Sequence, residues 1–238
     1  MINLFYSNDI QVENSYIITI KGNETSEKYA KRCADSCDAV GMSYKIWDAY
    51  DGTGDTIKDP DHLKDDDIMR LIKVTDHYLT KSEVACALSH ISLWAHCAKI
   101  DKPIVIFEHD AVVVKKFTTM KSYNSIVYLG GAEWAEAKWP IYDIPLHSAE
   151  GPNYHFICRA HAYAIDPTIA KNLLAHVIRY GINMPLDMFI RTDLFNISHQ
   201  GLYAYDKNTD RQNITWDTTI KSRPSTGRST KRNDKLED

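Results

Sequence analysis

A run of four apolar residues that ends abruptly in charged ones places the strongest constraint on the fold of this chain. Residues 104–107 read Ile-Val-Ile-Phe, and Glu108, His109 and Asp110 follow at once. A continuous apolar run of this length is typical of a central strand in a parallel sheet, because both faces of such a sheet are covered. The sequence therefore predicts a buried strand that brings two carboxylates to the carboxyl edge of a sheet, where α/β proteins bind ligands.

The residues before this run alternate between strand and helix patterns. Short strands are expected at Ser15–Ile20 and Tyr44–Ala49. Between them, a helical pattern from about 26 to 40 begins at a cap formed by Thr25 or Ser26. This β–α–β order favours an α/β domain with a parallel sheet.

A capping box predicts a second, longer helix. Thr80 and Glu83 have the spacing of a reciprocal N-terminal cap, and apolar residues recur at helical intervals after them. Further elements are expected as strands at 111–114 and 126–129 and a helix from about 168 to 180. The glycines at 130–131 should stop the second of these strands, and the polar chain after Gly201 should be irregular.

Composition places the chain among ordinary globular proteins, since 44% of its residues are hydrophobic and 25% are charged. No apolar run approaches the roughly 20 residues of a transmembrane helix, and we find no secretory leader. The odd number of cysteines, five, favours reduced thiols and a cytoplasmic protein. Cys33 and Cys37 share one helix face, but no second pair of soft ligands is spaced to complete a zinc site with them.

Charge is distributed unevenly along the chain. The formal net charge is −4, yet residues 221–238 contain six basic and three acidic residues. The five basic residues before the first acid of this segment are Lys221, Arg223, Arg228, Lys231 and Arg232. Such a run can contact DNA phosphates or an anionic membrane, or it can be a solvated terminus. We therefore expect one domain over 1–220 and a basic, flexible tail over 221–238.

The two carboxylates after the apolar run are candidate metal ligands. Because side chains alternate along an extended chain, Glu108 and Asp110 should point the same way and His109 the opposite way. Two oxygen ligands on one side suit Mg²⁺ or Mn²⁺ bound together with a diphosphate. The alternative is an acidic strand end that caps a helix or meets an arginine. The sequence lacks the glycine-rich signatures of P-loop and Rossmann proteins and the nucleophile elbow of α/β-hydrolases.

Several short motifs follow one another in a characteristic order. A helical segment contains Glu83, Cys86, Ser89-His90 and Leu93-Trp94, and the apolar strand that ends in Glu108-His109-Asp110 comes next. The other matching segments are Tyr16–Thr19, 47–52, 128–130, 162–165 and Met184–Asp187. The ordered set, from about Ser15 to Thr219, resembles glycosyltransferase family 25, which includes lipopolysaccharide-biosynthesis sugar transferases and collagen galactosyltransferases. His109 departs from the family's Glu-Asp-Asp, and the arginine-rich start of the first helix is missing.

The resemblance implies an α/β fold with a single GT-A-like domain, whose mostly parallel central sheet is flanked by helices. It also implies metal-dependent transfer of a sugar from a nucleotide-diphospho-sugar, expected to be a UDP-sugar, to a hydroxyl group, with inversion. By this resemblance, donor contacts come from Thr19, Lys21, Ala49, Tyr50, Ser89, His90 and Glu108. Asp110, with Glu108, would bind Mn²⁺ or Mg²⁺. Asp187 is the candidate catalytic base, with helix capping as its alternative role, and Glu133 is the reserve base.

The acceptor has more than one interpretation. The family favours a glycan such as lipopolysaccharide core. The basic tail supports the alternative of a DNA glycosyltransferase that modifies a hydroxymethylated base, in which case the protein would be associated with DNA; a peripheral membrane location is also compatible with the tail. The His109 departure supports a third hypothesis, an inactive module that binds a sugar nucleotide or a partner protein.

Overall fold

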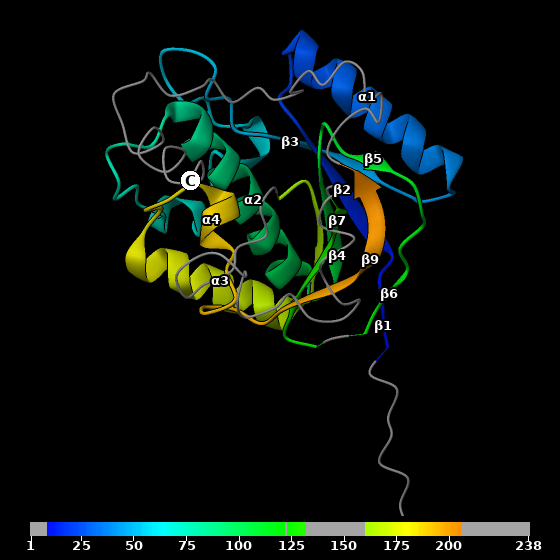
Figure 1. Cartoon of the computed structure of the whole chain (residues 1–238). Coiled ribbons are helices and arrows are strands. Elements are labelled where there is room, and N and C mark those ends of the chain that lie inside the picture. The colour runs from blue at the N-terminus through cyan, green and yellow to red at the C-terminus, as the bar shows by residue number, and fades with distance from the viewer. Residues whose placement is uncertain (1–8, 122, 132–159, 206–238) are drawn as a thin grey trace, which may run out of the picture.

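The computed structural model describes residues 9–121, 123–131 and 160–205 (Figure 1). Its strands are β1 (Ile10–Gln11), β2 (Asn14–Thr19), β3 (Lys45–Asp48), β4 (Ile104–Glu108), β5 (Val112–Val113), β6 (Thr119–Met120), β7 (Ile126–Gly131), β8 (Ala162–Ile165) and β9 (Ile197–Tyr205). Its helices are α1 (Glu24–Ala39), α2 (Lys81–Ile100), α3 (Pro167–Tyr180) and α4 (Leu186–Phe189), with short 3₁₀ turns η1 (Asp61–Leu63) and η2 (Met69–Leu71). The strands expected at 15–20, 44–49 and 104–107 and the helix at 168–180 are confirmed.

Seven of the described strands form one mixed sheet in the order β3-β2-β4-β8-β7-β9-β5, while β1 pairs with β6 separately. β2 is parallel to both β3 and β4, and β7 is parallel to β9. β8 runs antiparallel to β4 and β7, and β5 runs antiparallel to β9. The α/β class is therefore confirmed. The expectation of a mostly parallel sheet is not confirmed, because half of the strand pairings are antiparallel.

The central strand β4 separates two apolar cores, as its continuous apolar sequence predicts. Ile104 and Ile106 belong to the core shared with α2 and α3, whereas Val105 and Phe107 belong to the core shared with α1. Figure 1 shows α2 and α3 on one side of the sheet and α1 on the other. All four strand residues are fully buried. Only the end of β4 can therefore present polar groups to a ligand.

The first residues of α1 and α2 show why each helix begins where it does. The Asn23 side chain caps α1 by accepting a hydrogen bond from the Ser26 N–H at 3.0 Å. The expectation that Thr25 or Ser26 is the cap was wrong, because the Ser26 hydroxyl instead accepts the Ile20 N–H at 2.9 Å. The capping box of Thr80 and Glu83 at the start of α2 is confirmed.

Two glycine positions differ from the sequence-based expectation. β7 continues through Gly130 instead of ending before it. A side chain at Gly130 would collide with the His161 ring, so close packing rather than a turn requires glycine there. β9 likewise continues past Gly201, which has a φ of 107° beside a register shift in the β7–β9 pairing. The glycine allows the strand to bulge at this point.

Candidate functional site

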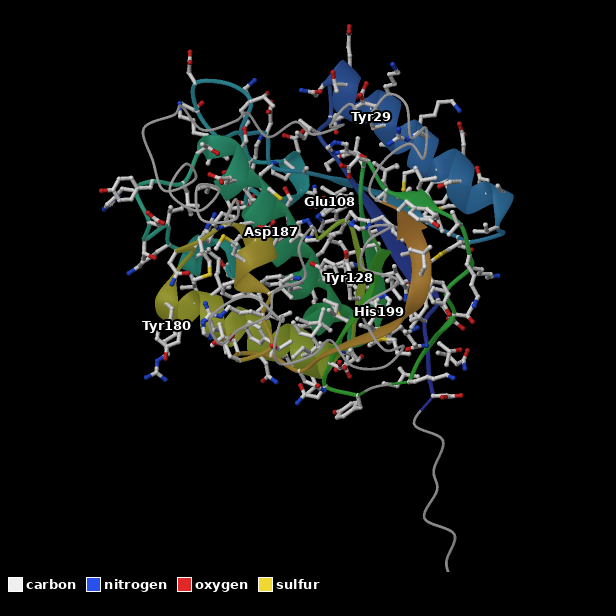
Figure 2. The ribbon with its side chains drawn as sticks, viewed as in Figure 1. Tyr29, Glu108, Tyr128, Tyr180, Asp187 and His199 are labelled. Atoms are coloured by element: carbon white, nitrogen blue, oxygen red, sulfur yellow. The ribbon has the colours of Figure 1, made fainter. Side chains whose placement is uncertain are left out.

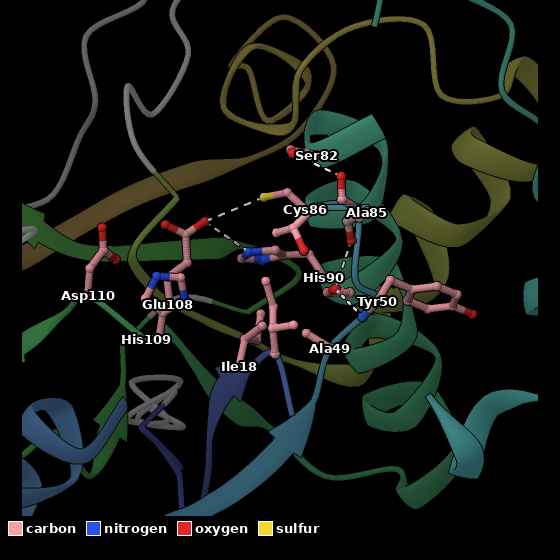
Figure 3. Close-up of a pocket in the computed structure, with 14 residues that line it drawn as sticks. Ile18, Ala49, Tyr50, Ser82, Ala85, Cys86, His90, Glu108, His109 and Asp110 are labelled. Atoms are coloured by element: carbon pink, nitrogen blue, oxygen red, sulfur yellow. Dashed lines mark hydrogen bonds and ion pairs between the residues drawn. The ribbon is translucent and has the colours of Figure 1, made fainter. Parts of the chain in front are cut away.

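A cavity of about 60 Å³ lies where the carboxyl ends of β2, β3 and β4 meet the first half of α2 (Figure 3). Its lining comes from one face of α2 and from the ends of β2, β3 and β4 with the segments that follow them. It consists of Ile18, Ile20, Ala49, Tyr50, Gly52, Thr53, Ser82, Ala85, Cys86, Ser89, His90, Glu108, His109 and Asp110. No lysine or arginine occurs among these described lining residues. The cavity is therefore anionic unless a cation is bound.

The end of β4 presents the acidic residues to this cavity. The Ala111 N–H donates to the Glu108 carbonyl at 3.1 Å, so a turn follows the strand directly. Figure 3 shows the Glu108 and Asp110 carboxylates on the same side of the chain, as expected. The expected alternation of side chains along an extended strand does not account for this placement, because residues 109–110 form a turn. The His109 ring stacks on the Tyr29 ring, with 6.1 Å between the ring centroids.

Asp110 is also held from the opposite face of the sheet. The Arg32 guanidinium of α1 donates to the backbone carbonyl of Asp110 at 2.9 Å. Because this contact is to the backbone, it does not test the alternative drawn from the sequence, in which the acidic side chain itself meets an arginine. The Asp110 carboxylate nevertheless lines the cavity, so the contact also fixes the segment that presents it.

A chain of hydrogen bonds connects the core to Glu108. The Trp94 Nε1–H donates to the Tyr163 hydroxyl at 2.9 Å, and this hydroxyl bonds His90 Nδ1 at 2.8 Å. His90 Nε2 lies 3.1 Å from Glu108 Oε1, and the Cys86 thiol lies 3.7 Å from the same oxygen. Because an ionised carboxylate can only accept, Nε2 carries the proton and Tyr163 donates to Nδ1. In this tautomer each of these bonds has one donor and one acceptor.

The pKa shifts in this network have opposite signs for Glu108 and Cys86. Loss of hydration raises the pKa of Glu108, but the hydrogen bond from His90 and the electrostatic influence of the nearby histidines outweigh it, so the net pKa is lowered. Loss of hydration and the Glu108 charge raise the pKa of the Cys86 thiol well above its usual range. Burial likewise raises the pKa of Tyr163. The corner therefore holds an ionised Glu108 beside a protonated thiol at neutral pH.

Ser89 positions the second strand end. Its hydroxyl donates to the Ala85 carbonyl at 2.7 Å and accepts the Tyr50 N–H at 3.0 Å. This bond attaches the segment after β3 to α2 and places Ala49 and Tyr50 against the cavity. Burial, aided by the charges of two nearby aspartates, raises the pKa of Tyr50 to about 12, so its hydroxyl remains protonated.

Asp187, the candidate base, lies in the first turn of α4. The N-cap of this helix is Pro185, so the alternative of a capping aspartate was wrong. Burial and the negative charge of Glu108 raise the pKa of Asp187. Figure 2 labels Asp187 and Glu108, which come from distant parts of the sequence. Asp187 is not among the described residues that line the cavity.

The structure brings together most, but not all, of the residues expected to bind the donor. Ala49, Tyr50, Ser89, His90, Glu108 and Asp110 all line the cavity. Thr19 and Lys21 do not, because strand alternation presents Ile18 and Ile20 instead. Thr19 is buried and Lys21 is exposed. Glu133 and the basic tail lie outside the described residues, so their roles and the boundary at residue 220 stay predictions.

Cys86 and Tyr163 were not predicted as site residues. The bond from Tyr163 to His90 depends on the pairing of β4 with β8, which a single sequence does not reveal, whereas Cys86 contacts Glu108 where α2 meets the end of β4. One local signal was available, since Cys86 and His90 are four residues apart and therefore lie on one helix face.

A family model described as "Glycosyltransferase family 25 (LPS biosynthesis protein)" matches residues 12–190 of the chain. The match includes β2, α2, β4, Tyr163 and Asp187, and it confirms the resemblance drawn from the ordered motifs. No curated protein matches the sequence. Across the described ranges, no helix combines the length and the apolar character needed to cross a bilayer.

Proposed function

The chain belongs to glycosyltransferase family 25 and is therefore a sugar transferase, and we propose that it uses a nucleotide-diphospho-sugar as donor at the cavity beside Glu108 and Asp110. The observation that carries this proposal is the pair of carboxylates at the carboxyl edge of the sheet. Ligands of open α/β sheets bind at this edge.

A divalent cation fits this anionic cavity. A diphosphate carries negative charge, and the described lining offers carboxylates but no lysine or arginine to receive it. Oxygen donors such as Asp110 and Glu108 suit Mn²⁺ or Mg²⁺, which often bind together with phosphate oxygens. The cation would stabilise the negative charge that develops on the departing nucleotide diphosphate.

The remaining lining gives the donor a defined orientation. Ile18 and Ile20 supply an apolar surface, and Ala49 and Tyr50 form the adjoining strand end. We assign the nucleoside, expected to be uridine, to this side and the diphosphate to the carboxylate side. Ser89 acts by holding the Tyr50 backbone.

Asp187 is the proposed general base for an inverting transfer. A base must accept the proton of the acceptor hydroxyl, and its efficiency increases as its pKa approaches the working pH. Burial and Glu108 shift the pKa of Asp187 in that direction. The words "LPS biosynthesis" in the family description support a lipopolysaccharide-type glycan as the acceptor.

A mass-spectrometric panel tests this function. The full chain is incubated with Mn²⁺ and a set of UDP-sugars, together with lipopolysaccharide core oligosaccharides or hydroxymethylated duplex DNA. Transfer to the oligosaccharide is the expected result. Transfer to DNA alone would support the DNA glycosyltransferase, whereas neither hydrolysis nor transfer with any donor would support the inactive binding module.

A further inference from the structure

Three side chains with different ligand chemistry converge where α2 meets the end of β4. Cys86 Sγ, His90 Nε2 and Glu108 Oε1 belong to a set of potential ligand atoms that lie within 4.8 Å of one another. Cys86 and His90 lie on one face of α2, and β4 supplies Glu108 opposite them (Figure 3).

Two of the three distances between these atoms match edges of a zinc tetrahedron. With ordinary Zn–S, Zn–N and Zn–O bonds, the N···O edge is about 3.3 Å and the S···O edge about 3.5 Å. The corresponding separations are 3.1 Å for His90–Glu108 and 3.7 Å for Cys86–Glu108. Shifts of a few tenths of an ångström would therefore bring these two edges to coordination lengths. The third edge, between Cys86 Sγ and His90, lies within the 4.8 Å that the group spans.

His90 also has the outer partner that a metal-bound imidazole requires. Metal-binding histidines almost always bond a second group through their other ring nitrogen, which fixes the orientation of the ring. His90 Nδ1 lies 2.8 Å from the Tyr163 hydroxyl, which is itself held by Trp94. A hydroxyl can either donate or accept. Tyr163 can therefore donate to Nδ1 when Nε2 carries a proton, and accept from Nδ1–H when Nε2 binds a metal.

The charge around the thiol favours a cation. The charges of Glu108, Asp187 and Asp110 all disfavour a Cys86 thiolate, and no lysine or arginine lines the described cavity to offset them. When a metal coordinates the sulfur, the thiol proton leaves to solvent and the divalent charge compensates the thiolate and the carboxylate.

We propose that Cys86, His90 and Glu108 form a binding site for a borderline divalent ion, of which Zn²⁺ is the best match. The S, N and O donors differ from the all-oxygen set that Mg²⁺ prefers. Three protein ligands leave the fourth position of a zinc site open. Because all three residues line the cavity of about 60 Å³, and a water needs roughly 10–15 Å³ by this measure, there is room for water in that position. This site does not depend on the proposed transfer reaction.

Cobalt titration tests the site without an activity assay. The full chain is freed of metals with a chelator and titrated with Co²⁺, which gives visible absorption when tetrahedral and a near-ultraviolet thiolate-to-metal band when bound to cysteine. We expect both signals to saturate at one equivalent and to disappear when Zn²⁺ displaces the cobalt. Cys86→Ser should remove the thiolate band, and His90→Gln should weaken binding at least tenfold.

Two other cysteines provide matched controls. Cys97 lies on the same helix outside the cavity lining, and Cys158 lies outside the described residues. Cys97→Ser and Cys158→Ser should keep the thiolate band, and circular dichroism confirms that each variant is folded. The absence of a thiolate band in the folded wild-type protein would overturn the proposal, as would a band that persists in Cys86→Ser or disappears only in a control. Because Glu108 belongs to both proposed sites, Mn²⁺-dependent donor turnover is measured in a separate assay, and the thiolate band alone decides the Cys86–His90–Glu108 site.

Discussion

Helices α1 and α2 carry similar sequence signals in different surroundings. Cys33 and Cys37 are four residues apart on α1, as Cys86 and His90 are on α2. The α1 pair is fully buried in the apolar core that also contains Val105, and Cys33 shares a hydrogen bond with Cys37. The α2 pair faces the end of β4, where a carboxylate completes the group.

The difference shows that spacing places side chains on one helix face, while the opposing element determines their role. α1 packs on the sheet where the strand side chains are apolar, so its thiols contribute to packing. α2 extends along the sheet as far as the end of β4, where polar groups are available. We therefore expect substitutions of the two α1 thiols to affect stability alone, and substitutions in the α2 corner to affect both stability and chemistry.

The largest expected effect is on donor turnover, which should fall for a substitution beside α2 and not for one on α1. Glu108→Gln removes the carboxylate charge and should reduce donor turnover at least about 100-fold, a loss comparable to that of one transition-state-stabilising group. Cys37→Ala on α1 should leave turnover per folded molecule unchanged. The measurement is hydrolysis or transfer of the donor identified by the panel. Similar losses in both variants would contradict the comparison.

A smaller effect concerns stability. Tyr163→Phe removes the group that bonds both Trp94 and His90, and leaving such buried polar groups unpaired should cost about 2 kcal/mol. Cys33→Ala removes a packed sulfur and its weak hydrogen bond with Cys37, and should cost about 1 kcal/mol. Urea denaturation measures both free energies of unfolding. Only Tyr163→Phe should also lower turnover, and an equal effect of Cys33→Ala on turnover would count against the assignment.

The smallest expected effect is a gain in stability, whereas most substitutions destabilise a protein. The pKa of Asp187 is raised by burial and by Glu108, so its stabilising contribution is present at low pH and is lost as pH rises through the folded-state pKa. Asp187→Asn should therefore become more stable than the wild type as pH rises above about 4, by on the order of 1 kcal/mol at neutral pH, while turnover falls.

Asp193 provides the opposite case as a control. A hydrogen bond and ion pair with Arg191 lower the pKa of Asp193. Its contribution is present above the unfolded-state pKa and is lost as pH falls through the folded-state pKa. Asp193→Asn should therefore destabilise the protein at neutral pH without affecting turnover. Thermal unfolding between pH 4 and 8 measures the stability of both variants. A loss of stability in Asp187→Asn at neutral pH would show that the ionised Asp187 side chain does not destabilise the folded protein.

Local patterns predicted the central strand and the positions of its acidic residues. The apolar run Ile104–Phe107 is typical of a covered strand, and the capping box located the start of α2. The antiparallel insertion of β8 between β4 and β7 could not be read from short segments, because it depends on pairing between residues far apart in the sequence. The same pairing brings Tyr163 to His90, which explains why this part of the site was not predicted.

Thr19 and Lys21 show a second limit. The sequence located the strand end, but the choice between alternate residues depends on which face of β2 meets α2, and that face presents Ile18 and Ile20 to the cavity. A one-residue difference reverses the direction of every side chain in a strand. The helix pattern of α2 was more informative, because Ser89 and His90 both lie on the face that lines the cavity.

The most direct test of the account is cation-dependent binding of UDP to the cavity. Titration calorimetry compares chelator-treated protein with and without Mn²⁺, using the wild type and Asp110→Asn. The account predicts UDP binding that is at least tenfold tighter with Mn²⁺ in the wild type, and no such gain in Asp110→Asn. Equal UDP affinity with and without Mn²⁺, or an undiminished gain in Asp110→Asn, would contradict it.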